Sequence, residues 1–171
     1  MKRQKGFSLI ELLIVVAIIL IIAAIAVPNL LRSRMAANEA SSAGSLRTIA
    51  TSNVTYSTTY GIGFSPDLLS LGPGAGAGAT SDQADLIDTT LAAGTKSGYT
   101  FTYTVDPAGG STPVLPNEGY TTESTPVSVN SGASYFCIDA TNVVRKDPGG
   151  TLGASAAGTA CDDGSGTFPA M

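Results

Sequence analysis

The N-terminal stretch of the chain reads MKRQKG (residues 1–6), then FSLIELLIVVAIILIIAAIAV (residues 7–27), then Pro28. A short basic leader therefore meets an apolar run of about 21 residues, long enough to cross a bilayer as a helix. The run holds one ionisable residue, Glu11. A carboxylate at that depth costs about 2.5–3.5 kcal/mol on insertion scales, so we expect Glu11 to have a partner and a function.

Two ordinary interpretations explain this segment poorly. In a secretory signal peptide, the basic leader would form the n-region and Ala24-Ile25-Ala26 would be the cleavage site. The apolar region of such a peptide is usually about 7–15 residues long and carries no carboxylate. A plain single-pass anchor would have no use for Glu11.

Residues 5–12, KGFSLIEL, resemble the class III signal of type IV pilins and of their relatives, the pseudopilins. The shared order is a basic leader, Gly, Phe, an apolar stretch with Glu, and Pro near its end. The resemblance is closest over residues 1–60 and is looser beyond. It implies an α+β, pilin-like fold, in which a long N-terminal helix packs on a small antiparallel sheet.

The resemblance also implies how the chain is processed. A prepilin peptidase would cleave between Gly6 and Phe7 and methylate the new amine of Phe7. The leader charges are Lys2, Arg3 and Lys5, and the residues tied to assembly are Glu11 and Pro28.

The partners that the resemblance implies are the membrane before assembly, an inner-membrane platform with its ATPase, and identical subunits in a helical filament. The subunit would first be a single-pass inner-membrane protein and later part of a surface pilus. One alternative is a pseudopilin of type II secretion, in a periplasmic filament. Another is a secreted binding domain with an ordinary signal peptide, whose mature form would begin at Val27.

The helical pattern continues beyond the apolar run, because no proline occurs between Pro28 and Pro66. We predict one helix from about Phe7 to about Thr58, ended by Gly61 and Gly63, and loosened at Pro28. One stripe of this helix needs a domain to pack against. The stripe consists of Leu31, Met35, Leu46, Ile49, Tyr56 and Tyr60, with Asn38, Ser42 and Asn53 between them.

The predicted organisation is a cleaved leader (1–6), a long helix (7–60) that spans the membrane over 7–27, and a globular head (61–171). In the head, we predict a short helix that begins at Asp82 and closes at Gly94. Strict alternation predicts a strand over 99–105. Further strands are predicted within 120–129, over 135–138 and over 143–145, with a tight turn at 139–142.

Composition argues against several functions. The chain of 171 residues has 9 basic and 13 acidic residues and no histidine. Loss of the leader would leave six basic residues, a net charge of −7. An acidic body argues against nonspecific nucleic-acid binding, which needs a basic surface. No catalytic constellation is recognisable, since arrangements that depend on histidine are excluded. We therefore predict neither an enzyme nor a cofactor or metal.

Two cysteines, Cys137 and Cys161, lie in the C-terminal part. An exported domain with two cysteines can form one disulfide, and we predict this pair, with two unpaired thiols as the alternative. The pair is similar in position to the loop closed by a disulfide in many pilins, which favours the pilus over the pseudopilus.

Four features allow a functional and an ordinary interpretation, and we favour the ordinary one each time. Asn53-Val54-Thr55 matches a glycosylation sequon but lies on the helix stripe. Asp139 and Asp162-Asp163-Gly164 could offer oxygens to calcium, but their spacing is not that of a calcium loop. Tyr56 and Tyr60 could form a stacking pair, but their helical spacing is typical of core residues. The glycine-rich stretch 72–79 lacks the Lys-Ser/Thr ending of a phosphate loop.

Overall fold

The structure is a computed structural model that describes residues 7–74, 76, 78–105, 117–148, 161 and 171. The chain divides into two compact units, Met1–Arg34 and Met35–Met171. The second, or globular, unit includes the C-terminal half of the long helix as well as the sheet.

A single helix, α1, spans Leu9–Tyr60 and runs through Pro28 without interruption. The predicted long helix is thus confirmed to within two residues at each end. It stops at Gly61, which has a φ of +66° and donates its N–H to the carbonyl oxygen of Ser57 at 3.0 Å. This left-handed conformation is open to glycine without strain and is a common way for a helix to end.

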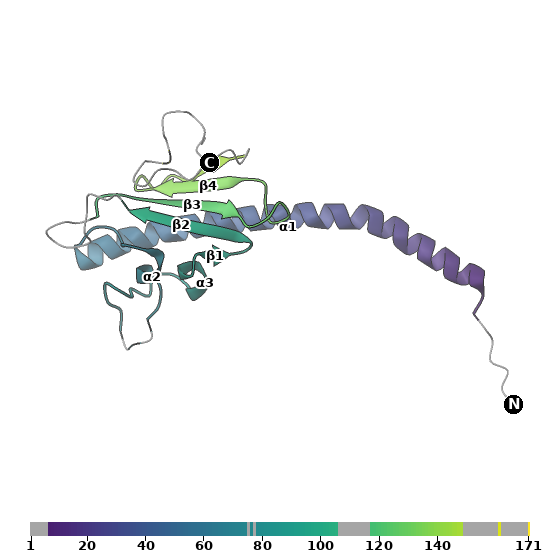
Figure 1. The fold of residues 1–171 in the computed structure, drawn as a ribbon, viewed down its shortest axis with the longest axis horizontal. Helices are drawn as coiled ribbons and strands as arrows, with labels where there is room; N and C mark the ends of the chain where they lie inside the picture. The colour runs from purple at the N-terminus through teal and green to yellow at the C-terminus, as the bar shows by residue number, and fades with distance from the viewer. Residues whose placement is uncertain (1–6, 75, 77, 106–116, 149–160, 162–170) are drawn as a thin grey trace. The chain divides into compact units, whose positions relative to one another are not determined.

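The globular unit contains one antiparallel sheet of five strands in the order β1-β2-β3-β4-β5 (Figure 1). The strands are β1 (Thr95–Lys96), β2 (Tyr99–Val105), β3 (Tyr120–Pro126), β4 (Tyr135–Asp139) and β5 (Arg145–Asp147). Two one-turn helices, α2 (Leu68–Leu71) and α3 (Thr89–Ala92), precede the sheet in the chain. The α+β fold class predicted from the sequence is confirmed.

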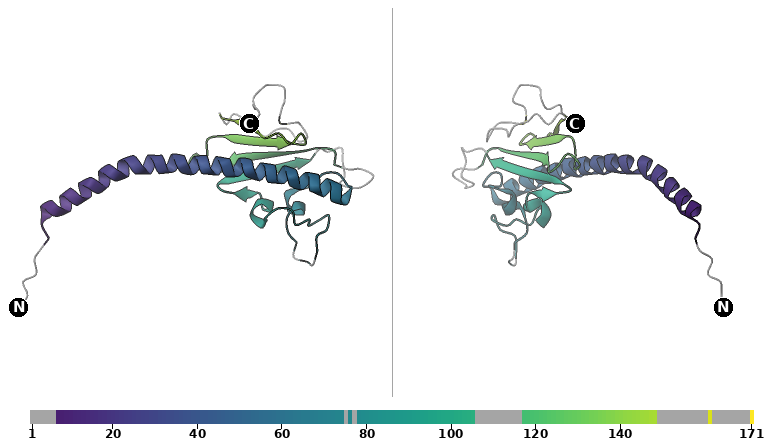
Figure 2. Two further views of the ribbon diagram at one scale, coloured as in Figure 1. Left: turned by 180° about the vertical axis from the view of Figure 1, so that it is seen from behind. Right: turned by 45° about the vertical axis from the view of Figure 1, so that its right-hand side comes forward.

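The core of the globular unit lies between α1 and one face of this sheet. Within the globular unit, α1 lies over one face of the sheet, as the view from behind shows (Figure 2). Leu46, Ile49 and Tyr56 of α1 are almost completely buried. They form one hydrophobic cluster with sheet residues that include Tyr99, Phe101, Phe136 and Ile138. The predicted stripe is therefore correct in this part of α1, whereas Leu31, in the other unit, is exposed.

The predicted helix at residues 82–94 is wrong. Only Thr89–Ala92 is helical, and its N-cap is Asp88, not Asp82. The backbone N–H groups of Ala84, Leu86 and Ile87 donate to the carbonyl oxygens of Ser70 and Leu71 at 2.8–3.1 Å. Because these groups pair with α2, they cannot form the i to i−4 bonds of a longer helix.

The last strand differs from the prediction, because β5 lies at residues 145–147, two residues later than predicted. Strand β3 lies within the predicted range 120–129 and ends at Pro126, which has no N–H to extend the ladder. The short strand β1 was not predicted, because two residues are too few to show an alternation of apolar and polar side chains. The turn at 139–142 is confirmed: the Asn142 N–H donates to the Asp139 carbonyl oxygen at 2.9 Å.

Polar contacts join α1 to the loop between β3 and β4. The Glu39 carboxylate accepts the N–H groups of Ala133 and Ser134 at 3.0 and 3.2 Å, and it pairs with Lys146 Nζ at 3.2 Å. Burial by itself would raise the pKa of Glu39. The bonds from Ala133, Lys146 and Ser134 and the charge of Lys146 outweigh burial and hold the pKa below its ordinary value of 4.5.

This depressed pKa predicts a pH-dependent contribution to stability. A carboxylate with a lowered pKa stabilises the fold above its unfolded pKa and loses that contribution as the pH falls through the folded value. We expect Glu39→Gln to lower the free energy of unfolding by about 1–2 kcal/mol at pH 7. The difference from wild type should shrink as the pH falls from 4.5 towards 3, in denaturant titrations of the chain in detergent. The matched control is Glu118→Gln at an exposed carboxylate. A pH-independent difference would contradict the assignment.

Candidate assembly segment and the disulfide-linked sheet

Glu11 caps the start of α1. The backbone N–H of Ser8 donates to Glu11 Oε2 at 3.1 Å, and the Ser8 carbonyl oxygen accepts the Leu12 N–H at 3.2 Å. Ser8 and Glu11 therefore stand three residues apart at the N-terminus of the helix, as the two residues of a capping box do. This local role of Glu11 was not predicted from the sequence, although the Ser-x-x-Glu spacing indicates it.

The segment from Phe7 to Val27, here called the apolar segment, buries almost none of its surface. Phe7, Leu9 and Ile10 are exposed by 75%, 77% and 67%, and all positions through Val27 are exposed except the half-buried Ala23. By length and composition, α1 could cross a membrane, and its apolar stretch lies near the N-terminus. A helix that is apolar on every side is stable in lipid or among other helices, not in water.

The leader residues Lys2, Arg3, Lys5 and Gly6 lie outside the described part of the chain, so their processing role stays a prediction. Pro28 is exposed within α1. Proline has no N–H, so the hydrogen bond that residue 28 would otherwise donate to the Ala24 carbonyl oxygen is missing.

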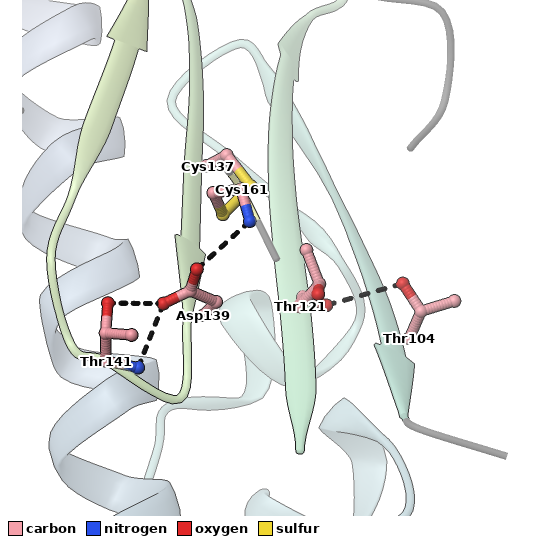
Figure 3. The surroundings of a disulfide bond; sticks show 6 residues. All are labelled: Thr104, Thr121, Cys137, Asp139, Thr141 and Cys161. Atoms are coloured by element: carbon pink, nitrogen blue, oxygen red, sulfur yellow. Dashed lines mark hydrogen bonds between the residues drawn. A yellow bond between two sulfur atoms is a disulfide. The ribbon is translucent and has the colours of Figure 1, made fainter. Parts of the chain in front are cut away.

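Cys137 and Cys161 form a disulfide, with their Cα atoms 5.8 Å apart. Asp139, two residues after Cys137, supports this connection (Figure 3). Its Oδ2 accepts the Cys161 N–H at 3.0 Å, and its Oδ1 accepts the N–H and hydroxyl of Thr141 at 2.9 and 2.6 Å. The predicted disulfide pairing is confirmed. Asp139 fixes the backbone at both Cys161 and Thr141.

Both carboxylate oxygens of Asp139 therefore accept hydrogen bonds from the protein, which argues against a role as a calcium ligand. The other carboxylates considered for calcium, Asp162 and Asp163, lie outside the described residues. Among the residues that the structure describes, no three His, Cys, Asp or Glu side chains are grouped so that they could hold a metal ion.

Asn53 is a structural residue within the globular unit. It is completely buried, and its Nδ2 donates to the Ile49 carbonyl oxygen at 3.2 Å. Its Oδ1 accepts the Ser65 N–H at 3.1 Å and the Tyr103 hydroxyl at 2.9 Å. Burial raises the pKa of Tyr103, so the hydroxyl stays protonated and able to donate. A glycan on Asn53 is incompatible with this folded arrangement.

Tyr56 and Tyr60 also belong to the core, as the sequence favoured. Their ring centroids are 4.9 Å apart, and the planes are tilted by 55°. Tyr56 is 1% exposed, and its hydroxyl donates to the Ser81 carbonyl oxygen at 2.8 Å. The pair therefore joins α1 to the loop that follows α2.

Comparison with known proteins identifies the N-terminal segment. Residues 1–27 match the family described as the prokaryotic N-terminal methylation motif. The N-terminal region is 62% identical over 39 residues to the type IV wide pilus major component PilA4 of Thermus thermophilus. That match covers 23% of this chain and 30% of the relative. No solved structure was found to match the chain.

The N-terminal region of this chain is thus similar to that of a type IV pilin. The motif contains Gly6, Phe7 and Glu11, the residues singled out from the sequence. The likeness is confined to the start of the chain, so the sheet and the disulfide are properties established by this structure and not by the relative.

The disulfide gives a prediction for the globular unit. Closing a loop of 24 residues stabilises a fold by about 3 kcal/mol in the chain-entropy model. We expect Cys161→Ser to lower the free energy of unfolding of the globular unit by about that amount. Intact-mass spectrometry of the wild-type chain should show a loss of about two hydrogens relative to the reduced form. Two thiols that alkylate freely without a reductant would contradict the pairing.

Proposed function

We propose that this chain is the precursor of a structural subunit of a type IV pilus-like filament. The observation that carries the proposal is an apolar segment with one carboxylate, exposed on all sides and matching the methylation motif of such subunits. The likeness to pilins indicates a structural subunit rather than an enzyme. The 62% identical relative is a pilus component, which favours a pilus over the pseudopilus of type II secretion.

In this proposal, a prepilin peptidase cleaves between Gly6 and Phe7 and methylates the amine of Phe7. Glycine at position 6 lets the enzyme approach the backbone closely, because it has no Cβ. Before assembly, residues 7–27 hold the subunit in the inner membrane, with the basic leader of the precursor on the cytoplasmic side. An ATPase-driven platform then moves the subunit into the filament.

The physical basis of assembly is that apolar helices can exchange lipid for one another. Leu, Ile and Val side chains of the apolar segment then pack against neighbouring helices and stay away from water. Glu11 enters a nonpolar environment and needs a cation, because an unpaired buried charge costs several kcal/mol. The Phe7 amine of a neighbouring subunit is one such cation. Pro28 allows the helix to adjust where the apolar segment ends.

The capping contact of Glu11 must be separated from its charge in any test. Glu11→Gln keeps an oxygen that can accept the Ser8 N–H but removes the charge, whereas Glu11→Ala removes both. We expect both variants to be cleaved normally and to accumulate in the membrane, because the apolar segment loses its insertion penalty. We expect few or no fibres from either, measured by electron microscopy and by the sheared surface fraction.

The two variants give different outcomes if the proposal is wrong. Wild-type fibre numbers from Glu11→Gln but not from Glu11→Ala would mean that only the helix cap matters. Wild-type numbers from both would mean that Glu11 has no part in assembly. Fibres that stay within the periplasm of wild-type cells would indicate the pseudopilus instead of the pilus.

A further inference from the structure

One side of α1 in the globular unit faces away from the sheet and is exposed. We call it the outer stripe, and it consists of Gly44, Arg47, Thr48, Thr51, Val54, Thr55 and Thr58. The spacing of three and four residues places these positions on one side of the helix. The buried residues of α1 in this unit, such as Leu46 and Ile49, lie on the opposite side, against the sheet.

The threonines of the outer stripe bond to their own helix. The hydroxyls of Thr48, Thr51, Thr55 and Thr58 donate to backbone carbonyls four residues earlier, at 2.9–3.1 Å. Each hydroxyl proton is therefore already used inside the helix. An apolar partner could cover this surface without leaving those donors unpaired, which is the main cost of burying a hydroxyl.

Two open hollows flank the outer stripe. One, of about 430 Å³, extends to Leu86, and the other, of about 340 Å³, extends to Asn142. Arg47 and Thr51 line both hollows. The ridge of α1 and its two hollows thus offer a partner helix a surface rich in methyl and methylene groups, with the Arg47 side chain bordering both hollows.

Among the described cationic side chains of the globular unit, Arg47 is the one without a partner. Lys96 pairs with Asp88 at 2.7 Å, and Lys146 pairs with Glu39. Arg145 also has an interaction partner. The Arg47 guanidinium is exposed and makes no such contact. A guanidinium matches a carboxylate in geometry and can donate two bonds to it.

The apolar segment is complementary to this surface. It is a helix of aliphatic side chains whose one ionisable group is the carboxylate of Glu11. The outer stripe is a methyl-rich ridge with one unpaired cation. We propose that the outer stripe of one subunit binds the apolar segment of a second copy of this chain, with Arg47 paired to Glu11. This inference rests on the proposed filament and names the partner surface within it.

The pairing is compatible with the Phe7 amine as a second cation. A carboxylate has two oxygens and can accept bonds from an ammonium and a guanidinium together. The contact joins two different surfaces of identical chains, so it is heterologous, and it propagates into an open helical filament when the rotation between neighbours does not close into a ring. Arg47 then selects the register at which a new apolar segment docks, because only one position along that segment, Glu11, carries a negative charge.

Proximity in the fibre is the direct test. The double variant Ile10→Cys/Thr51→Cys places one thiol beside Glu11 and one beside Arg47. We expect oxidised fibres of this variant to give a ladder of covalent multimers on non-reducing gels. The matched control is Ile10→Cys/Thr102→Cys, because Thr102 is exposed and its strand neighbours Phe101 and Tyr103 belong to the cluster under α1. A ladder from the control, or none from Thr51→Cys in well-formed fibres, would overturn the inference and leave the filament proposal intact.

Charge variants give an independent readout if the cysteine variants assemble poorly. We expect Arg47→Glu to reduce fibre yield at least about tenfold, because removing one partner of a buried charge pair strongly lowers the affinity of an interface. Arg47→Lys should keep most of the yield, and so should Lys96→Glu, which alters a half-buried cation outside the stripe. Wild-type yield from Arg47→Glu would overturn the pairing. So would loss of the processed subunit from the membrane, which would indicate lipid headgroups as the partner. If the wild-type chain forms no fibres, the filament proposal itself fails.

Discussion

A helix that is apolar on every side, with one carboxylate near its start, is the constraint on which this protein depends. The residues from Phe7 to Val27 are exposed, except for the half-buried Ala23. Such a helix is stable only where something else supplies the apolar surroundings, and lipid and neighbouring helices can both do so. In the proposed filament, the chemistry that favours membrane residence also favours assembly, and we propose that the pairing of Glu11 distinguishes the two states.

The globular unit shows how the same helix is used for two purposes. One side of α1 supplies Leu46, Ile49 and Tyr56 to a core shared with the sheet. Polar residues of that side, such as Glu39 and Asn53, fix loops by accepting backbone N–H groups. The disulfide and Asp139 tie Cys161 to β4. These contacts hold the unit together without using the outer stripe, which stays exposed.

Much of this organisation could be predicted from the sequence, where the pattern was long and regular. The 52-residue helix, the alternating strand β2 and the turn at 139–142 were all readable, because periodicity over several residues leaves few alternatives. The helix predicted at Asp82 failed because a cap residue is only a local signal. Backbone groups of residues 84–87 pair with α2, and no local pattern reveals that pairing. The two-residue strand β1 was not predicted for the same reason: it is defined by its pairing with β2, which no local pattern reveals.

Some residues of interest could be recognised from the sequence, whereas others could be recognised only from the structure. The motif residues Gly6, Phe7 and Glu11 stand out in the sequence because their order is unusual. The structure was needed to show that Asn53 is buried in a hydrogen-bond network and not available to a glycan. It was also needed to distinguish Arg47 from the lysines, since only the folded unit shows which cations have partners. A sequence shows where charges are, whereas pairing depends on the tertiary fold.

The proposed mature subunit retains residues 7–27 and uses them in assembly, and the identity of its N-terminus tests this most directly. Intact-mass and N-terminal analysis of protein purified from membranes and fibres should give a chain that begins at Phe7 and carries one methyl group on its amine. The Gly6→Val precursor should keep Met1 or Lys2 at its start and remain uncleaved. A mature chain that begins at Val27 would show that the apolar segment is an ordinary signal peptide, and the proposed filament subunit would be wrong.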